Sequence, residues 1–174
     1  LDELGLRYVL ALRTHQHAGI DEVHITGSDK THDAMVWGPP GPESAARRAR
    51  NEPLLKKHIT SELGNISPVL VVPGPWDEAS LDFQARNIAG MVCNNASFNC
   101  NSAKLLVTSS GWNGRTHLLE LIGKNIATGG TRSAYYPGAE QRWKQFTDGR
   151  KNLKIIGEAK PGQLPYAIIS DVDR

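Results

Sequence analysis

Residues 58–72 read HITSELGNISPVLVV and contain two short β-rich runs with turn residues between them. We predict a strand at residues 58–63, which ends at Gly64, and a second strand at residues 68–72. Both runs contain β-branched and apolar residues, which suit a strand that packs in a core. This segment therefore predicts two strands, each bounded by turn residues.

Residues 76–94 follow with a helical pattern of apolar side chains and with two acids where a helix N-terminus favours them. The polar, turn-like stretch at residues 94–101 separates this helix from a strand predicted at residues 104–108. A strand, a helix and a further strand in this order are typical of parallel strands covered by helices. We therefore predict an α/β fold, with a parallel sheet flanked by helices.

The rest of the chain shows the same alternation of helical patterns and β-rich runs. The further helices are predicted at residues 1–17, 44–55, 113–126 and 139–146. The further strands are predicted at residues 23–26, 34–37, 153–156 and 166–169. A Pro/Gly cluster at residues 38–42 is the strongest break in the pattern.

Composition excludes several classes of protein. The chain has 174 residues, 39% of them hydrophobic, which suffices for one substantial core. Its formal net charge is +2 and its basic residues are dispersed, so we expect no nucleic-acid partner. The apolar runs are too short to span a bilayer, so we expect no membrane partner. Two cysteines fit a reducing compartment, and we expect a cytoplasmic protein.

Two strand ends contain residues suited to chemistry. After the strand at residues 23–26, Gly27 has no Cβ. Backbone N–H groups and the hydroxyls of Thr26 and Ser28 could therefore approach an anion closely. A simple strand-end turn explains the same three residues. Glu62 ends another strand, where its carboxylate could take a proton from water. An ordinary surface glutamate is the alternative interpretation.

Cys100 lies in the polar sequence NASFNCNS at residues 95–102. A reactive thiol needs solvent access and hydrogen-bond donors, and a polar loop supplies both. Cys93 lies among apolar residues of the predicted helix, and we interpret it as a core residue. The histidines lack a ligand spacing and the two cysteines have no second pair, so we expect no metal site.

Taken in order, these segments resemble the aldehyde dehydrogenase superfamily. Residues 25–28, ITGS, are similar to the family's Phe-Thr-Gly-Ser segment, whose serine touches the pyrophosphate of the cofactor. Residues 62–68, ELGNISP, resemble the Glu-Leu-Gly-Gly-Lys-Ser-Pro segment that carries the general base. Residues 95–100 resemble the loop that holds the catalytic cysteine, which also follows the glutamate in the family.

The resemblance implies an oxidoreductase that oxidises an aldehyde to a carboxylic acid with NAD or NADP. The reaction would pass through a cysteine thiohemiacetal and thioester, with Cys100 as nucleophile and Glu62 as base. The residues that match cofactor contacts of the family are Thr26, Gly27, Ser28, Leu63 and Gly64. A small-molecule aldehyde would be the substrate, and the full-length protein would be a homo-oligomer, a dimer or a tetramer.

The resemblance further implies a partial chain, an aldehyde-dehydrogenase-like fragment. Residues 1–60 would form the C-terminal part of the Rossmann-like NAD(P)-binding domain, and residues 61–174 the N-terminal part of the catalytic domain. Asn65 and Ile66 replace the family's second glycine and its lysine. Two alternatives therefore stay open. One is an acylating enzyme that uses coenzyme A, against which the retained Glu62 counts, and the other is a non-catalytic fragment or pseudoenzyme of the same fold.

Overall fold

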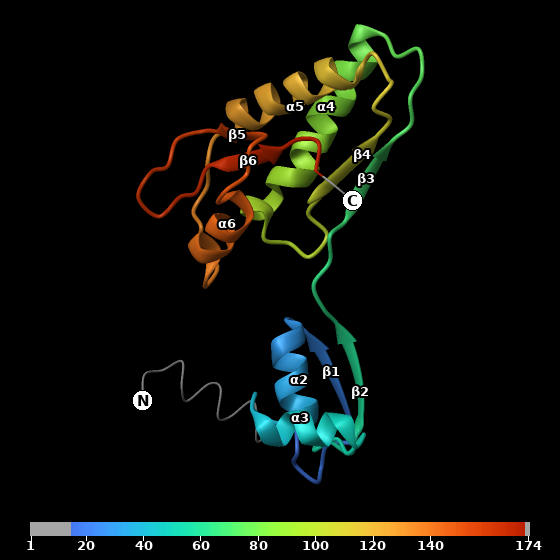
Figure 1. The fold of residues 1–174 in the computed structure, drawn as a ribbon, viewed down its shortest axis with the longest axis vertical. Helices are drawn as coiled ribbons and strands as arrows, with labels where there is room; N and C mark the ends of the chain where they lie inside the picture. The colour runs from blue at the N-terminus through green and yellow to red at the C-terminus, as the bar shows by residue number, and fades with distance from the viewer. Residues whose placement is uncertain (1–14, 173–174) are drawn as a thin grey trace. The chain divides into compact units, whose positions relative to one another are not determined.

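A computed structural model describes residues 15–172 of the chain (Figure 1). The chain divides into two compact units, Leu1–Asn65 and Ile66–Arg174. The helix predicted at residues 1–17 lies largely outside the described residues. Its last three residues are described, and residues 15–19 are turn-like and not helical.

The first unit contains one pair of parallel strands and two helices. The elements are β1 (Glu22–Thr26), α2 (Asp29–Trp37), α3 (Pro42–Ala49) and β2 (His58–Glu62). The strands β1 and β2 pair in parallel. Leu54 and Leu55 donate their backbone N–H groups to the Val36 carbonyl at 2.7 and 3.3 Å. Because Val36 and Leu55 are also buried, this contact joins the end of α2 to the segment before β2.

The prediction of a strand at residues 34–37 is wrong, because these residues form the end of α2. Ser28 caps this helix by accepting a hydrogen bond from the Thr31 backbone N–H at 3.1 Å. Asp29 places a negative charge in the first turn, where the helix dipole favours it. The apolar run at residues 34–37 is too short for its periodicity to distinguish a strand from a helix.

The helix predicted at residues 44–55 is α3, which starts earlier and ends at Ala49. Pro42 occupies the first turn, where its missing N–H costs nothing. Asn51 has a positive φ of 53°, which a helix does not allow, and Pro53 follows. The helix therefore ends before Leu54 and Leu55, the apolar residues at the end of the predicted range.

The second unit contains two small sheets and three α-helices. Its strands are β3 (Pro68–Val71), β4 (Leu105–Thr108), β5 (Leu153–Ile156) and β6 (Tyr166–Ile169). Its α-helices are α4 (Glu78–Cys93), α5 (Arg115–Gly129) and α6 (Ala139–Thr147), and the short turn η1 (Asn94–Ser97), which contains residues of non-helical backbone, follows α4. The α/β class is thus confirmed, with small sheets flanked by helices.

The prediction of a single parallel sheet holds only in part. The pair β3–β4 is parallel, like β1–β2, but β5 and β6 are antiparallel. A parallel pair needs a crossover connection of about a dozen or more residues. Residues 157–165 alone join β5 to β6, and this connection is too short for a crossover. In the described residues the strands form three separate pairs.

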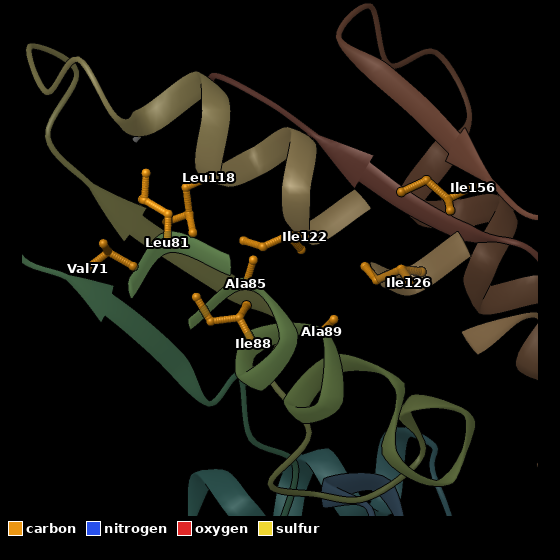
Figure 2. Packing of buried hydrophobic residues seen from close by; sticks show 9 residues of the cluster. All are labelled: Val71, Leu81, Ala85, Ile88, Ala89, Leu118, Ile122, Ile126 and Ile156. Carbon is orange, nitrogen blue, oxygen red and sulfur yellow. The ribbon is translucent and has the colours of Figure 1, made fainter. Parts of the chain in front are cut away.

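The core of the second unit lies between α4, α5 and one face of the β3–β4 pair (Figure 2). On α4 the buried residues Leu81, Ala85 and Ile88 are four and three positions apart, so they share one face of the helix. The cluster consists of Val71, Leu81, Ala85, Ile88, Ala89, Leu118, Ile122, Ile126 and Ile156. The helical patterns predicted from sequence therefore supply most of this core.

The other face of the β3–β4 pair is apolar and exposed. Along β3 the side chains alternate, so that Val71 is 6% exposed and Leu70 is 71% exposed. On β4, Leu105 and Val107 are exposed in the same way. Parallel sheets are as a rule covered on both faces, and the described residues leave this face open.

We expect Leu118→Ala to lower the free energy of unfolding by about 3–5 kcal/mol, because it opens a cavity in a closely packed core. Leu118 is 0% exposed. The matched control is Leu70→Ala, which removes the same atoms from an exposed side chain and should cost less than about 1 kcal/mol. Urea denaturation followed by circular dichroism measures both, and equal losses in the two variants would contradict this description of the core.

Candidate functional site

The carboxyl ends of β1 and β2 bring together two predicted site segments. Thr26 lies opposite Glu62 in the parallel register, and the Gly27 backbone N–H donates to the Glu62 carbonyl at 3.0 Å. Ser28 follows directly as the N-cap of α2. Ligands of open α/β sheets bind at the carboxyl ends of the strands, so Thr26, Ser28 and Glu62 lie at the edge where a ligand is expected.

The turn between β1 and α2 contains the residues predicted to bind a phosphate group of a cofactor, Thr26, Gly27 and Ser28. Two of the first backbone N–H groups of α2 already have side-chain partners, because Lys30 donates to Asp29 Oδ1 at 2.8 Å and Thr31 donates to Ser28 Oγ at 3.1 Å. The Ser28 hydroxyl lies 3.0 Å from the Thr31 hydroxyl. A Cβ at Gly27 would meet nothing closer than the Ile25 side chain at 3.7 Å, so the backbone is open. The Gly27 N–H is engaged by the Glu62 carbonyl, so the features that favour a phosphate are the hydroxyls and the missing Cβ at Gly27, and the negative charge of Asp29 opposes it.

Leu63 and Gly64 continue from β2 as irregular chain, with Leu63 half-buried and Gly64 exposed. The Glu62 side chain is exposed as well, so within the described residues its carboxylate is open to water. The first unit ends one residue later, at Asn65. Glu62 thus belongs to the first unit and Cys100 to the second, and their catalytic pairing stays a prediction.

The two cysteines of the second unit differ in environment. Cys100 is exposed in the loop between η1 and β4, whereas Cys93 at the end of α4 is half-buried and packs against the core. Burial raises the pKa of the Cys93 thiol, which disfavours its thiolate. Cys100 is therefore the thiol that a substrate or a reagent can reach more easily.

Three consecutive residues ahead of Cys100 have a left-handed backbone. The φ angles are 50° for Asn95, 53° for Ala96 and 66° for Ser97. Residues other than glycine rarely adopt this conformation, and each costs about 1 kcal/mol or more, with asparagine the most tolerant. Such a run persists where contacts with the surrounding structure hold it.

Contacts from the segment before α6 hold this loop. The Tyr135 hydroxyl donates to Asn95 Oδ1 at 3.0 Å, and Asn95 Nδ2 donates to Asn99 Oδ1 at 2.8 Å. The Phe98 ring packs edge-on against Tyr135 at 5.1 Å between centroids and stacks on Tyr136 at 5.6 Å. The first residue of the left-handed run and the residues that follow the run are therefore fixed by side-chain contacts.

Two further residues contact the Cys100 loop, and neither was among the predicted site residues. The Ser67 hydroxyl donates to the Cys100 carbonyl at 3.3 Å, and the Lys104 ammonium donates to oxygens of Ser97 and Ser102. The sequence could have identified Ser67, because it belongs to the segment ELGNISP. It could not have identified Lys104, because a single lysine at the start of an apolar run is typical of an exposed strand end.

A hollow of about 480 Å³ lies at the far ends of β3 and β4 from Cys100, lined by residues 73–76, 109 and 111–114. These segments follow the carboxyl ends of the two strands, whereas Cys100 precedes the amino end of β4. Two tryptophans line it, Trp76 and Trp112, with ring centroids 5.4 Å apart. None of the predicted site residues lines this hollow.

Within residues 15–172, no three His, Cys, Asp or Glu side chains lie together as metal ligands would. His117, for example, contacts Glu78 at 2.9 Å, and this hydrogen bond raises the pKa of His117. Within residues 15–172, no helix combines the length and the apolar character that crossing a membrane requires.

Comparison with solved structures shows which known fold the chain shares. An indole-3-acetaldehyde dehydrogenase in complex with NAD+ matches 68% of the chain with a TM-score of 0.51 at 19% identity. The chain has part of the aldehyde dehydrogenase fold. It spans about a fifth of that structure, 21% of its length.

Two other aldehyde dehydrogenase structures match less well. The enzyme KauB from Pseudomonas aeruginosa is 18% identical, with a TM-score of 0.47 over 67% of this chain and 20% of its own. A cysteine-to-alanine mutant of the P. syringae indole-3-acetaldehyde dehydrogenase AldA, in complex with NAD+ and IAA, is 17% identical. Its TM-score is 0.48 over 68% of this chain and 21% of its own. No protein-family model and no curated protein matches the sequence.

In this aldehyde dehydrogenase fold, we expect Ala96→Gly to leave the free energy of unfolding unchanged or to raise it by up to about 1 kcal/mol. Glycine adopts a positive φ without a steric penalty, which offsets its larger entropy when unfolded. The control is Ala127→Gly on the exposed side of α5, which should cost up to about 1 kcal/mol. Thermal and urea denaturation measure both, and a clear loss at position 96 would argue against the left-handed loop.

Proposed function

We propose that the chain forms part of an NAD(P)-dependent aldehyde dehydrogenase that uses Cys100 as its nucleophile. The observation that carries the proposal is the exposed Cys100 thiol on a loop fixed by Ser67, Tyr135 and Lys104, within part of an aldehyde dehydrogenase fold. The first unit would be the end of the cofactor-binding domain, and the second the start of the catalytic domain.

In the first step, the Cys100 thiolate adds to the carbonyl carbon of an aldehyde. A carbon–sulfur bond forms, the carbonyl π electrons move to oxygen, and the product is a thiohemiacetal oxyanion. Hydrogen-bond donors must stabilise this charge, and we assign the Cys100 backbone N–H as one of them. A loop of fixed geometry serves this step, because the donor and the sulfur must hold their positions together.

When bound, NAD+ or NADP+ would supply the two-electron oxidation that converts the thiohemiacetal on Cys100 to a thioester, and a hydride would pass to the cofactor. The Thr26 and Ser28 hydroxyls would hold a phosphate group of this cofactor, and Gly27, which has no Cβ, would let it approach the backbone closely. Leu63 and Gly64 would contact it from the end of β2. The support is the hydroxyl group of Ser28 at the start of α2 and the open backbone at Gly27.

In the last step, Glu62 would take a proton from water, whose oxygen attacks the thioester carbon. The carbon–sulfur bond breaks, the thiolate of Cys100 leaves, and the carboxylic acid is released. Over the full cycle the aldehyde is oxidised by two electrons, the cofactor is reduced by two, and water supplies the oxygen. The exposed carboxylate at the carboxyl end of β2 supports this role.

We further propose that the substrate is a small aldehyde and that the full-length enzyme is a cytoplasmic homo-oligomer, a dimer or a tetramer. The acylating alternative differs only in the acceptor, since coenzyme A would take the acyl group in place of water. Turnover measured with and without coenzyme A therefore distinguishes the acylating enzyme from the hydrolytic one.

We expect Cys100→Ala in the full-length protein to lower aldehyde oxidation by on the order of a thousandfold or more, because the covalent route is lost. Cys93→Ala is the matched control and should keep most of the activity, since Cys93 packs against the core. Formation of NAD(P)H measured by absorbance tests both variants. The opposite ranking of the two would overturn the assignment of the nucleophile.

We expect Glu62→Gln to leave the first turnover intact and to slow steady-state turnover by on the order of 100- to 10,000-fold, because only deacylation needs the base. Stopped-flow absorbance would then show a burst of NAD(P)H. Glu22→Gln, at the other end of the same strand pair, is the control. An unchanged steady state would exclude Glu62 as the base, and recovery of turnover by coenzyme A alone would favour the acylating enzyme.

A further inference from the structure

The hydroxyl of Tyr135 begins a chain of hydrogen bonds that ends at the residue before Cys100. It donates to Asn95 Oδ1 at 3.0 Å, and Asn95 Nδ2 donates in turn to Asn99 Oδ1 at 2.8 Å. Asn99 directly precedes Cys100 in the sequence. The amide group of Asn95 is therefore held at both its oxygen and its nitrogen, which fixes the torsion angles of this side chain.

The hydrogen bond between Asn95 and Asn99 spans the strained part of the loop. Asn95 begins the left-handed run, and its φ of 50° is one that asparagine tolerates better than most residues. Ala96 and Ser97 have the same conformation without that tolerance. The bond across residues 96–98 closes this turn, and the Tyr135 hydroxyl holds Asn95 in the rotamer that makes the bond.

The segment that carries Tyr135 is itself anchored to the connection between β5 and β6. The Ala134 backbone N–H donates to the Gly162 carbonyl at 2.8 Å, and Ser133 forms an isolated bridge with Gln163. The Thr131 hydroxyl donates to the Gln163 side chain as well. The Tyr135 hydroxyl therefore reaches the Cys100 loop from a segment that is fixed on its other side.

The aromatic rings make a second contact that does not involve the hydroxyl. Phe98 packs edge-on against the Tyr135 ring and stacks on the Tyr136 ring. Both contacts remain when a tyrosine is replaced by phenylalanine, because the ring is kept. The role of the hydroxyl can therefore be tested separately from the packing of the rings.

The position of the Cys100 sulfur depends on the backbone of this loop. The side chain is exposed, so packing around it contributes little to its position. A nucleophile and the hydrogen-bond donors around it must keep their relative positions, and a displacement of about 1 Å can cost on the order of a hundredfold in rate. A contact that holds the loop is therefore expected to affect the reaction at the sulfur.

We propose that Tyr135 is a positioning residue whose hydroxyl, through Asn95 and Asn99, holds the loop in the geometry in which Cys100 reacts. The catalytic meaning of this inference rests on the proposed function. The first measurement below requires neither aldehyde nor cofactor, so failure of the inference is distinguishable from failure of the proposed function.

The first measurement is hydrogen exchange of the loop amides, followed by mass spectrometry of the full-length protein. The Phe98 and Ser102 backbone N–H groups donate to the Asn95 and Asn99 carbonyls at 3.0 and 3.1 Å, so their exchange reports opening of the loop. We expect Tyr135→Phe to accelerate this exchange about 2- to 10-fold, as the loss of one hydrogen bond implies. Exchange as slow as in the unsubstituted protein would overturn the proposal.

The matched control is Tyr136→Phe. This substitution also removes one phenolic hydroxyl, and it keeps the ring that stacks on Phe98. We expect exchange at the loop amides to stay within about twofold of that in the unsubstituted protein, because the contact lies in the ring. Equal acceleration in the two phenylalanine variants would show that the Tyr135 hydroxyl has no special role, and would overturn the proposal.

The second measurement is the first turnover, followed by stopped-flow absorbance of NAD(P)H. We expect Tyr135→Phe to slow the burst by on the order of tenfold, with the cofactor Kd unchanged within about twofold. A residue that only stabilises the fold would leave the burst rate of the folded enzyme unchanged, and that result overturns the proposal. Absence of any burst in the unsubstituted protein overturns the proposed function instead, and the exchange measurement then decides whether Tyr135 holds the loop.

A double-mutant cycle with Asn95→Gly tests the route of this effect. Glycine keeps the positive φ without a steric penalty, but it removes the amide that accepts from Tyr135. We therefore expect Tyr135→Phe to have no further effect on exchange or on the burst in the Asn95→Gly background. Equal effects of Tyr135→Phe in both backgrounds would show that the hydroxyl does not act through Asn95, and would overturn the proposal.

Discussion

Burial of apolar side chains between α4, α5 and the β3–β4 pair is the interaction on which the second unit depends. Each fully buried aliphatic side chain contributes about 1.5–3 kcal/mol, and the cluster around Leu118 and Ile122 contains several of them. This packing also fixes where α4 ends and where β4 begins. The Ala103 backbone N–H donates to the Met91 carbonyl at 3.1 Å, so the two ends of the Cys100 loop are tied to each other.

The loop between these fixed ends combines backbone strain with side-chain contacts that offset it. Asn95, Ala96 and Ser97 have positive φ angles, and the hydrogen bonds of Tyr135 and Lys104 hold the residues at both ends of this run. Strain of this kind is common where a reactive group has to be presented in one geometry. The outcome is an exposed thiol on a restrained loop, which suits a nucleophile better than either a buried thiol or a mobile one.

In the first unit, the parallel pairing of β1 with β2 brings residues from distant parts of the chain to one edge of the strand pair. Thr26 and Glu62 are 36 positions apart and lie opposite each other because β1 and β2 pair in register. Gly27 then turns the chain into α2, whose N-terminus is capped by Ser28. The phosphate site and the base that we propose therefore depend on the same strand pairing.

The sequence by itself determined the types of most elements, the α/β class and the candidate residues, because these follow from local periodicity and from the order of short motifs. The predicted strands at residues 23–26, 58–63, 68–72 and 104–108 each agree with the structure to within one residue at either end. Tertiary structure decided the helical state of residues 34–37, the antiparallel pairing of β5 with β6 and the left-handed run at Asn95. It also decided that Lys104 lies inside the Cys100 loop. These features depend on caps, on connection lengths in space and on contacts between distant residues, none of which a local pattern contains.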